Sequence, residues 1–162
     1  MDFNLTDEQQ MLRDGARRFF REHYGFEQRR ALLASESGFS AECWARYAEL
    51  GWLALGQPEE SGGWACSFVE TAILLEAFGR ALALEPYLSS AVLCGHILGR
   101  CSDARAGGAA LQEMMKGRTR LALAHEGPGD RYDADFPGLV ATRRGDGFLL
   151  QGTKSCVLDA PA

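Results

Sequence analysis

The hydrophobic pattern of this chain changes at about Thr119, and that change limits the folds open to it. Before this point apolar residues recur at threes and fours, most clearly over residues 68–84, which is the spacing of a helix with a buried face. After it, short β-compatible runs cover residues 121–125, 138–142, 148–151 and 155–158. Helices followed by strands predict an α+β fold, with an amino-terminal all-α helical bundle over residues 1–118 and the start of an antiparallel β-domain over residues 119–162.

Capping and turn residues mark the helix boundaries. Thr6, with Gln9 three residues later, has the pattern of a capping box and predicts a first helix over residues 7–21. Ser40 is a favourable N-cap for another helix that begins directly after it. The remaining predicted helices cover residues 27–35, residues 68–84, a stretch from Pro86 through Ile97, and a stretch from Ser102 to Met115 that stops at Gly117.

A hairpin turn is predicted at Gly145-Asp146-Gly147, which separates two of the β-compatible runs. A sheet of about four short strands that ends with this sequence has an exposed edge, which natural proteins normally cover. We therefore expect either that the chain is the amino-terminal part of a longer protein or that a second polypeptide supplies the missing strands.

Charge and hydropathy exclude several classes of partner. A net charge of -5 argues against binding to nucleic acid, because such proteins gather Lys and Arg on one face. The chain has no run of about 18 apolar residues, and its first residues lack the pattern of a secretory signal. These patterns predict a cytoplasmic protein without membrane insertion.

The five cysteines do not have the spacing of a disulfide framework or a zinc ribbon. Cys94, His96 and Cys101 are the one cluster that could hold a metal, but a closed zinc site needs four ligands. We therefore expect buried, inert thiols and no metal site.

Taken in order, several motifs resemble the acyl-CoA dehydrogenase family along the whole chain. The motifs are DFNLTDEQQMLRDGARRFF, PEESGG, ETAILLEAFGRALALEPYL, LALAHEGPGD and GTKSCVLDAPA. The resemblance implies an oligomeric protein with a helical domain, a middle β-domain and a carboxy-terminal four-helix domain. It also implies FAD as cofactor and oxidation of an acyl-CoA substrate to its 2,3-enoyl form, with electrons passed to a separate acceptor. This chain resembles the first domain and the opening half of the second.

Catalysis in this family needs a carboxylate that abstracts the α-proton of the thioester. The resemblance places that carboxylate in the carboxy-terminal domain, so no residue of this chain is predicted to be the catalytic base. An alternative from another class is a non-catalytic, dehydrogenase-like subunit of a heteromeric complex. A third reading is a helical interaction domain with an unrelated hairpin.

Two segments resemble the flavin-contacting segments of the family. In the first, Ala122, Ala124 and His125 are the candidate cofactor-binding residues, with His125 where the family usually has Thr or Ser. In the second, Cys156 replaces a frequent aromatic residue and Leu158 a frequent hydroxyl residue. The resemblance therefore implies flavin contacts made mostly by backbone groups. His125 could instead be an ordinary strand residue.

The resemblance also implies substrate binding at Gly129 and Asp130, although a plain turn is the alternative, because the family's loop is longer and carries a Ser. Gly62 and Gly63 match a glycine loop whose expected role is structural. Glu70 and Glu76, on the helix that follows, are expected to be solvated or interfacial rather than catalytic.

Overall fold

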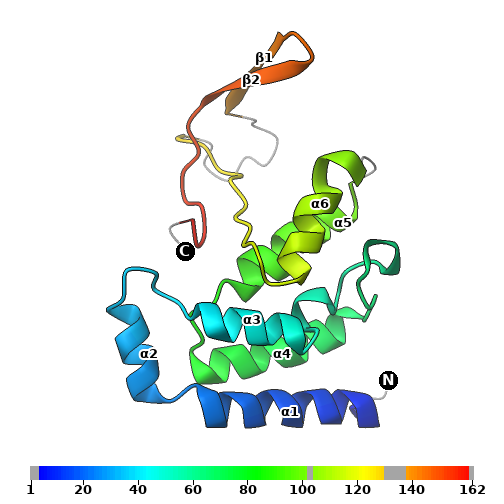
Figure 1. Cartoon of the computed structure of the whole chain (residues 1–162), viewed down its shortest axis with the longest axis vertical. Coiled ribbons are helices and arrows are strands. Elements are labelled where there is room, and N and C mark those ends of the chain that lie inside the picture. The colour runs from blue at the N-terminus through cyan, green and yellow to red at the C-terminus, as the bar shows by residue number, and fades with distance from the viewer. Residues whose placement is uncertain (1–3, 102–103, 130–137, 161–162) are drawn as a thin grey trace. The chain divides into compact units, whose positions relative to one another are not determined.

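The computed structural model describes residues 4–101, 104–129 and 138–160, which form two units (Figure 1). The helical unit comprises the described residues up to Leu121, and the hairpin unit runs from Ala122 to Ala160. Every helix of the described residues lies in the first unit, and the antiparallel strands lie in the second. The predicted α+β class is therefore confirmed, while the predicted domain boundary at residue 118 stays a prediction.

The helical unit begins with α1 (Asp7–His23), which lies along α4 (Phe68–Ala81) in Figure 1. The other helical segments of the unit follow in chain order. They are α2 (Phe26–Leu33), α3 (Ala41–Glu49), the short 3₁₀ turns η1 (Trp52–Ala54) and η2 (Glu59–Ser61), the π-helix η3 (Tyr87–Cys94), α5 (Gly95–Gly99) and α6 (Ala104–Met115).

The start of α1 is the predicted capping box. The Gln9 amide N–H donates to Thr6 Oγ1 at 3.2 Å, and the Thr6 amide N–H donates to Gln9 Oε1 at 3.0 Å. The two bonds satisfy donors that a helix start otherwise leaves free. The helix continues to His23, two residues beyond the prediction.

The end of α4 differs from the prediction, because the helix stops at Ala81 rather than at residue 84. Leu82 has a φ of 52°, in the left-handed region. The Ala83 amide N–H returns to the Phe78 carbonyl at 3.0 Å, and the Leu82 amide N–H donates to the Gly79 carbonyl at 3.1 Å. This pair of bonds is a Schellman closure, built here without the glycine that usually permits it.

The stretch after Pro86 is helical, as predicted, but its first part is wound as a π-helix over Tyr87–Cys94. The Tyr87 ring stacks on Phe78 at a centroid distance of 4.6 Å, which fixes the π-helix against α4. Ser90, fully buried on this helix, accepts the Leu121 amide N–H at 2.9 Å. The π-helix therefore packs on its neighbours through both an aromatic contact and a hydrogen bond.

The core of the helical unit is an aromatic cluster between α1, α3, η1 and α4. Tyr47 stacks on Trp52 at 5.4 Å between ring centroids, and Phe78 meets Tyr47 at 4.9 Å and Phe20 at 5.0 Å. Such contacts add to the free energy that burial itself contributes. The hydrophobic core that contains this aromatic cluster consists of the buried residues Ala16, Phe20, Tyr24, Cys43, Trp44, Tyr47, Trp52, Leu53, Leu55, Leu74, Ala77, Phe78, Tyr87, Ala91, Leu111 and Met114.

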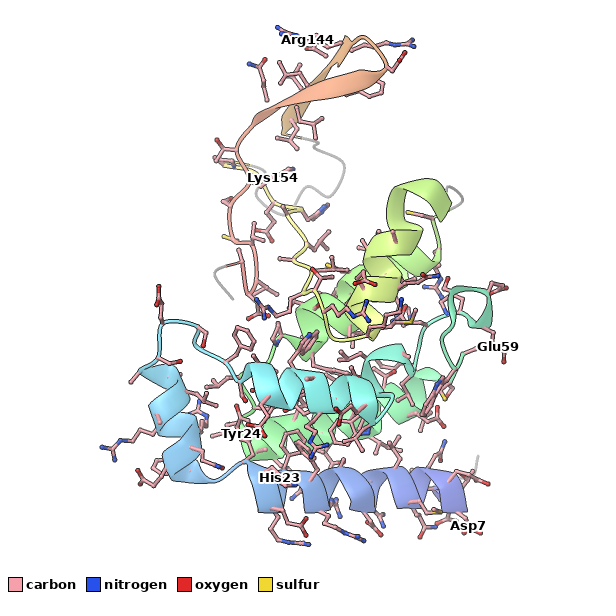
Figure 2. The ribbon with its side chains drawn as sticks, in the orientation of Figure 1. Asp7, His23, Tyr24, Glu59, Arg144 and Lys154 are labelled. Atoms are coloured by element: carbon pink, nitrogen blue, oxygen red, sulfur yellow. The ribbon has the colours of Figure 1, made fainter. Side chains whose placement is uncertain are left out.

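A buried carboxylate, Glu85, joins the segments around this core. Its Oε2 accepts the Tyr47 hydroxyl, and its Oε1 accepts the Ser40 amide N–H, each at 3.0 Å. Burial raises the pKa of the Tyr47 phenol, and the neighbouring Glu85 carboxylate raises it further. The Leu84 amide N–H donates to the Tyr24 hydroxyl at 2.8 Å. Tyr24, labelled in Figure 2, directly follows α1. The carboxylate thus holds the start of α3 to the segment that follows α4.

The hairpin unit contains β1 (Leu139–Arg144) and β2 (Gly147–Gly152), paired antiparallel from Leu139 opposite Gly152 to Arg144 opposite Gly147. The predicted turn is present. Gly145 has a positive φ of 59° and is the left-handed residue of this turn.

The prediction of about four strands is wrong for the described residues, which contain two. Residues 121–125 and 155–158 are not strands. A single backbone hydrogen bond between described residues connects these two segments, from the Ser155 amide N–H to the carbonyl of Glu126, which directly follows the first of them. A β-ladder needs a series of such bonds. A β-compatible sequence forms a strand only where a partner strand lies beside it.

Candidate functional site

The two segments predicted to contact a cofactor lie side by side in the hairpin unit. Lys154, labelled in Figure 2, donates from Nζ to the His125 carbonyl at 2.6 Å. The Ser155 amide N–H donates to the Glu126 carbonyl at 2.8 Å. Residues far apart in the sequence are thus held together at the two positions that carry the sequence motifs.

All five candidate cofactor-binding residues are exposed, and Leu158 retains 60% of its accessible surface. The other four are Ala122, Ala124, His125 and Cys156. Gly129 is exposed with a φ of 96°, which favours glycine there, whereas Asp130 lies outside the described residues. The structure therefore brings the first and second cofactor segments together and leaves the substrate-binding pair untested.

Backbone groups dominate the chemistry of this surface. Within the described parts of the chain, the amide N–H groups of Ala124 and His125 donate to no protein acceptor. In the second segment, Cys156 has a φ of 52°, uncommon for a residue other than glycine. Of the five side chains, the imidazole of His125 is the one that can form strong hydrogen bonds. Such a surface can bind a group that offers hydrogen-bond acceptors and an apolar ring face.

Lys154 joins the two cofactor segments, and the sequence patterns do not single it out. The resemblance points to Cys156 and Leu158 in this segment, whereas the Lys154 ammonium bridges the two segments. A lysine after a glycine and a threonine carries no distinctive signal, so only the structure reveals this bond.

The glycine loop of the helical unit, whose Glu59 is labelled in Figure 2, is held by its own backbone. The Gly63 amide N–H donates to the Pro58 carbonyl at 2.9 Å, and the Ala65 amide N–H donates to the Gln57 carbonyl at 2.8 Å. A Cβ on Gly63 would collide with the Gln57 backbone. The Trp64 ring lies over Gly51, where a side chain would likewise collide with it. These contacts are those of a structural loop.

Glu70 and Glu76 lie on α4 and form hydrogen bonds with residues of α1. Glu70 accepts Gln9 Nε2 at 2.7 Å and Ser67 Oγ at 2.6 Å. Burial alone raises the pKa of Glu70, but these hydrogen bonds outweigh it and hold the pKa below its ordinary value. Glu76 pairs with Arg80 at 2.9 Å and with Arg17 at 3.3 Å, and the hydrogen bond from Arg80 lowers its pKa most. Both carboxylates hold helices together.

The cysteines are all free thiols, but the expectation that they are buried is wrong for Cys101 and Cys156, which are exposed. Burial raises the pKa of the Cys43 and Cys94 thiols, which makes these two poor nucleophiles. Among the described residues no three His, Cys, Asp or Glu side chains come together as a metal site. None of the helices in the described part of the chain combines the length and the apolar character that a membrane-spanning helix needs.

Comparison with known proteins finds relatives both in sequence and in structure. The family model for the acyl-CoA dehydrogenase N-terminal domain matches residues 6–121. Mitochondrial isovaleryl-CoA dehydrogenase of Bos taurus is 26% identical over 160 residues, which cover 97% of this chain and 37% of that protein. Acyl-CoA dehydrogenase IpdE2 of Mycobacterium tuberculosis is 32% identical over 118 residues, 72% of this chain and 36% of the relative.

Among solved structures, the Tcur3481-Tcur3483 steroid ACAD G363A variant matches with a TM-score of 0.82 and 30% identity, over 95% of this chain and 42% of that one. The ChsE4-ChsE5 complex from Mycobacterium tuberculosis also matches with a TM-score of 0.82, at 28% identity, over 97% of this chain and 42% of the matched chain. This chain spans about two fifths of the length of these proteins.

Proposed function

The chain belongs to the acyl-CoA dehydrogenase family, and we propose that it is the amino-terminal part of an FAD-dependent enzyme that oxidises an acyl-CoA thioester to its 2,3-enoyl form. The observation that carries this proposal is the juxtaposition of the two cofactor segments through the Lys154 and Ser155 hydrogen bonds. The proposal includes a cytoplasmic location, an oligomeric enzyme and a separate electron acceptor.

The residues present fit FAD through their backbone more than through their side chains. The amide N–H groups of Ala124 and His125, which donate to no acceptor among the described residues, suit the oxygen and nitrogen acceptors of an isoalloxazine ring. Ala122, Cys156 and Leu158 would complete the contact surface with small or apolar groups. When bound, FAD would supply the hydride acceptor of the reaction.

The catalytic carboxylate is proposed to lie outside this chain, in the remaining part of the protein. The chain itself would hold and orient the flavin and, through Gly129 and Asp130, contact the acyl-CoA. The helical unit would wall one side of the acyl pocket, a role that needs apolar packing rather than reactive groups.

A second candidate is a non-catalytic partner subunit, and two observations favour considering it. No hydroxyl side chain stands at position 125 or 158, so a flavin would lose two hydrogen bonds. Two of the matched solved structures bear the names of two components, Tcur3481-Tcur3483 and ChsE4-ChsE5. In this reading the chain would keep packing surfaces and lose flavin binding.

The test uses the complete product of the native gene. Titration with FAD, followed by visible absorbance, measures binding, and incubation with a panel of acyl-CoA thioesters and an artificial electron acceptor measures enoyl-CoA formation. A yellow, active protein supports the dehydrogenase proposal. A protein that binds no FAD overturns it and leaves the partner-subunit reading.

Variants sharpen this test at the candidate surface. His125→Thr and Leu158→Thr each add a hydroxyl group and are expected to tighten FAD binding about fivefold to tenfold, as one added hydrogen bond would. Leu123→Thr, which places the same side chain at the neighbouring position, is the matched control. Equal gains in all three variants would mean that these positions do not face the flavin.

A further inference from the structure

A polar cluster inside the helical unit contains two buried atoms that hydrogen-bond to none of the described residues. Gln57 is 2% exposed, and its Nε2 donates to the Ala91 carbonyl of the π-helix at 2.8 Å. The amide orientation is fixed by this bond, because a flipped amide would set two oxygens against each other. Gln57 Oε1 and His96 Nδ1 are both buried, and neither has a hydrogen-bond partner among the described residues.

The two residues line the same small cavity, of about 10 Å³. It lies where η1 and the segment that leads into the glycine loop meet α4, η3 and α5. The lining residues are Trp52, Leu53, Gly56, Gln57, Thr71, Tyr87, Ala91, Val92 and His96. Polar residues from three segments, Gln57, Thr71 and His96, therefore line one small space.

The size and the polarity of the cavity select its occupant. A space of about 10–15 Å³ accommodates one water molecule when two or more polar groups surround it. A buried acceptor left unpaired costs about 1–3 kcal/mol, so an occupant that donates a hydrogen bond is favoured. A metal ion would need about four ligands, more than this donor set offers.

We propose that this cavity binds one structural water molecule, which donates a hydrogen bond to Gln57 Oε1 and bonds His96 Nδ1. Water suits the site whichever imidazole nitrogen carries the proton, because it both donates and accepts. The water would join α5 to the segment that enters the glycine loop, while Gln57 Nε2 joins that segment to the π-helix. This inference does not rest on the proposed function.

Two glycines keep the site open. A Cβ on Gly56 would lie 3.2 Å from His96 Cε1 and 3.4 Å from Thr71 Oγ1, so a methyl group there would enter the space beside the imidazole. A Cβ on Gly95 would collide with the Gln57 amide. Gly56→Ala is therefore a variant that competes with the water while leaving both of its polar partners in the protein.

The first test is direct observation of the water in the wild-type protein. A crystal structure at high resolution should show one peak within about 2.6–3.2 Å of both Gln57 Oε1 and His96 Nδ1. In solution, the Gln57 side-chain amide protons should show a nuclear Overhauser effect to a long-lived water. Absence of both signals, or a direct bond between Gln57 and His96, would overturn the proposal.

The second test perturbs the site. Gly56→Ala should abolish the peak and the Overhauser effect and lower the melting temperature, because Gln57 Oε1 then stays unpaired. Gly79→Ala is the matched control, since a Cβ at Gly79 meets nothing within 4 Å. Retention of the water signal in Gly56→Ala would contradict the assigned position. If that variant does not fold, the wild-type measurements still decide.

Discussion

The helical unit buries a cluster of large apolar side chains, whereas the hairpin unit leaves most of the apolar side chains of its strands exposed. The helical unit surrounds its aromatic cluster with α1, α3 and α4, and Leu74 and Met114 within it are completely buried. In the hairpin unit both strands are exposed along nearly their whole length, with Phe148 at 69% and Leu150 at 63% exposure. The difference teaches that the helical unit holds its own core, whereas the described residues of the hairpin unit contribute no side chain to a buried core.

The largest expected effect tests where the stabilising core lies. Leu74→Ala should lower the free energy of unfolding by about 3–4 kcal/mol, because it removes buried methyl groups and leaves a cavity. The same truncation at the exposed Leu150 should change it by less than about 0.5 kcal/mol. Urea denaturation followed by far-ultraviolet circular dichroism measures both. Equal losses would contradict the comparison.

The buried carboxylate provides the second test. Glu85→Ala should cost about 2–3 kcal/mol in urea denaturation, because the Tyr47 hydroxyl and the Ser40 amide N–H lose their acceptor in a buried site. Glu85→Gln, which keeps one side-chain oxygen, should cost about half as much. If the alanine variant were as stable as the wild type, the carboxylate would be dispensable to the helical unit.

The third test compares two left-handed residues, one in each unit. Leu82 and Cys156 both have a φ of 52°. Leu82→Gly should raise the unfolding free energy of the helical unit by about 1 kcal/mol, because glycine adopts this φ without steric cost. Cys156→Gly should leave that transition unchanged. Leu82→Ala, which keeps the Cβ, is the control and should bring no gain.

The smallest expected effect depends on pH. The Glu70 carboxyl has a pKa below its ordinary value, so its contribution is present above the unfolded-state pKa of about 4.3 and is lost as the pH falls through the folded-state value. Glu70→Gln should cost about 0.5 kcal/mol near pH 7, and this cost should shrink as the pH falls through the folded-state pKa. Glu59→Gln on the exposed loop is the control. A constant difference across the titration would refute the assignment.

The sequence predicted local features well where the cause of the structure was local. The capping box of Thr6 and Gln9 and the helix after Ser40 depend on residues a few positions apart, and both are confirmed. The family resemblance is confirmed by the match over residues 6–121. The end of α4 escaped prediction because the left-handed residue is a leucine, which normally avoids that conformation.

Features that depend on distant partners could not be predicted in the same way. Residues 121–125 have β-compatible side chains, but a strand also needs a neighbouring backbone, and sequence patterns do not report one. The bond from Lys154 to the His125 carbonyl joins positions 29 residues apart. Whether His125, Cys156 and Leu158 bind a flavin stays a prediction.

The position of Trp64, over Gly51 and partly exposed, affects the intrinsic fluorescence of the chain. All three tryptophans of the chain lie in the helical unit, with Trp44 and Trp52 buried and Trp64 55% exposed. Intrinsic fluorescence excited in the tryptophan band therefore reports on this unit alone, with Trp64 emitting at longer wavelength than the two shielded indoles. Because Trp64 is already exposed, a soluble quencher should remove the long-wavelength component first, and the two shielded indoles should become quenchable only when the helical unit unfolds.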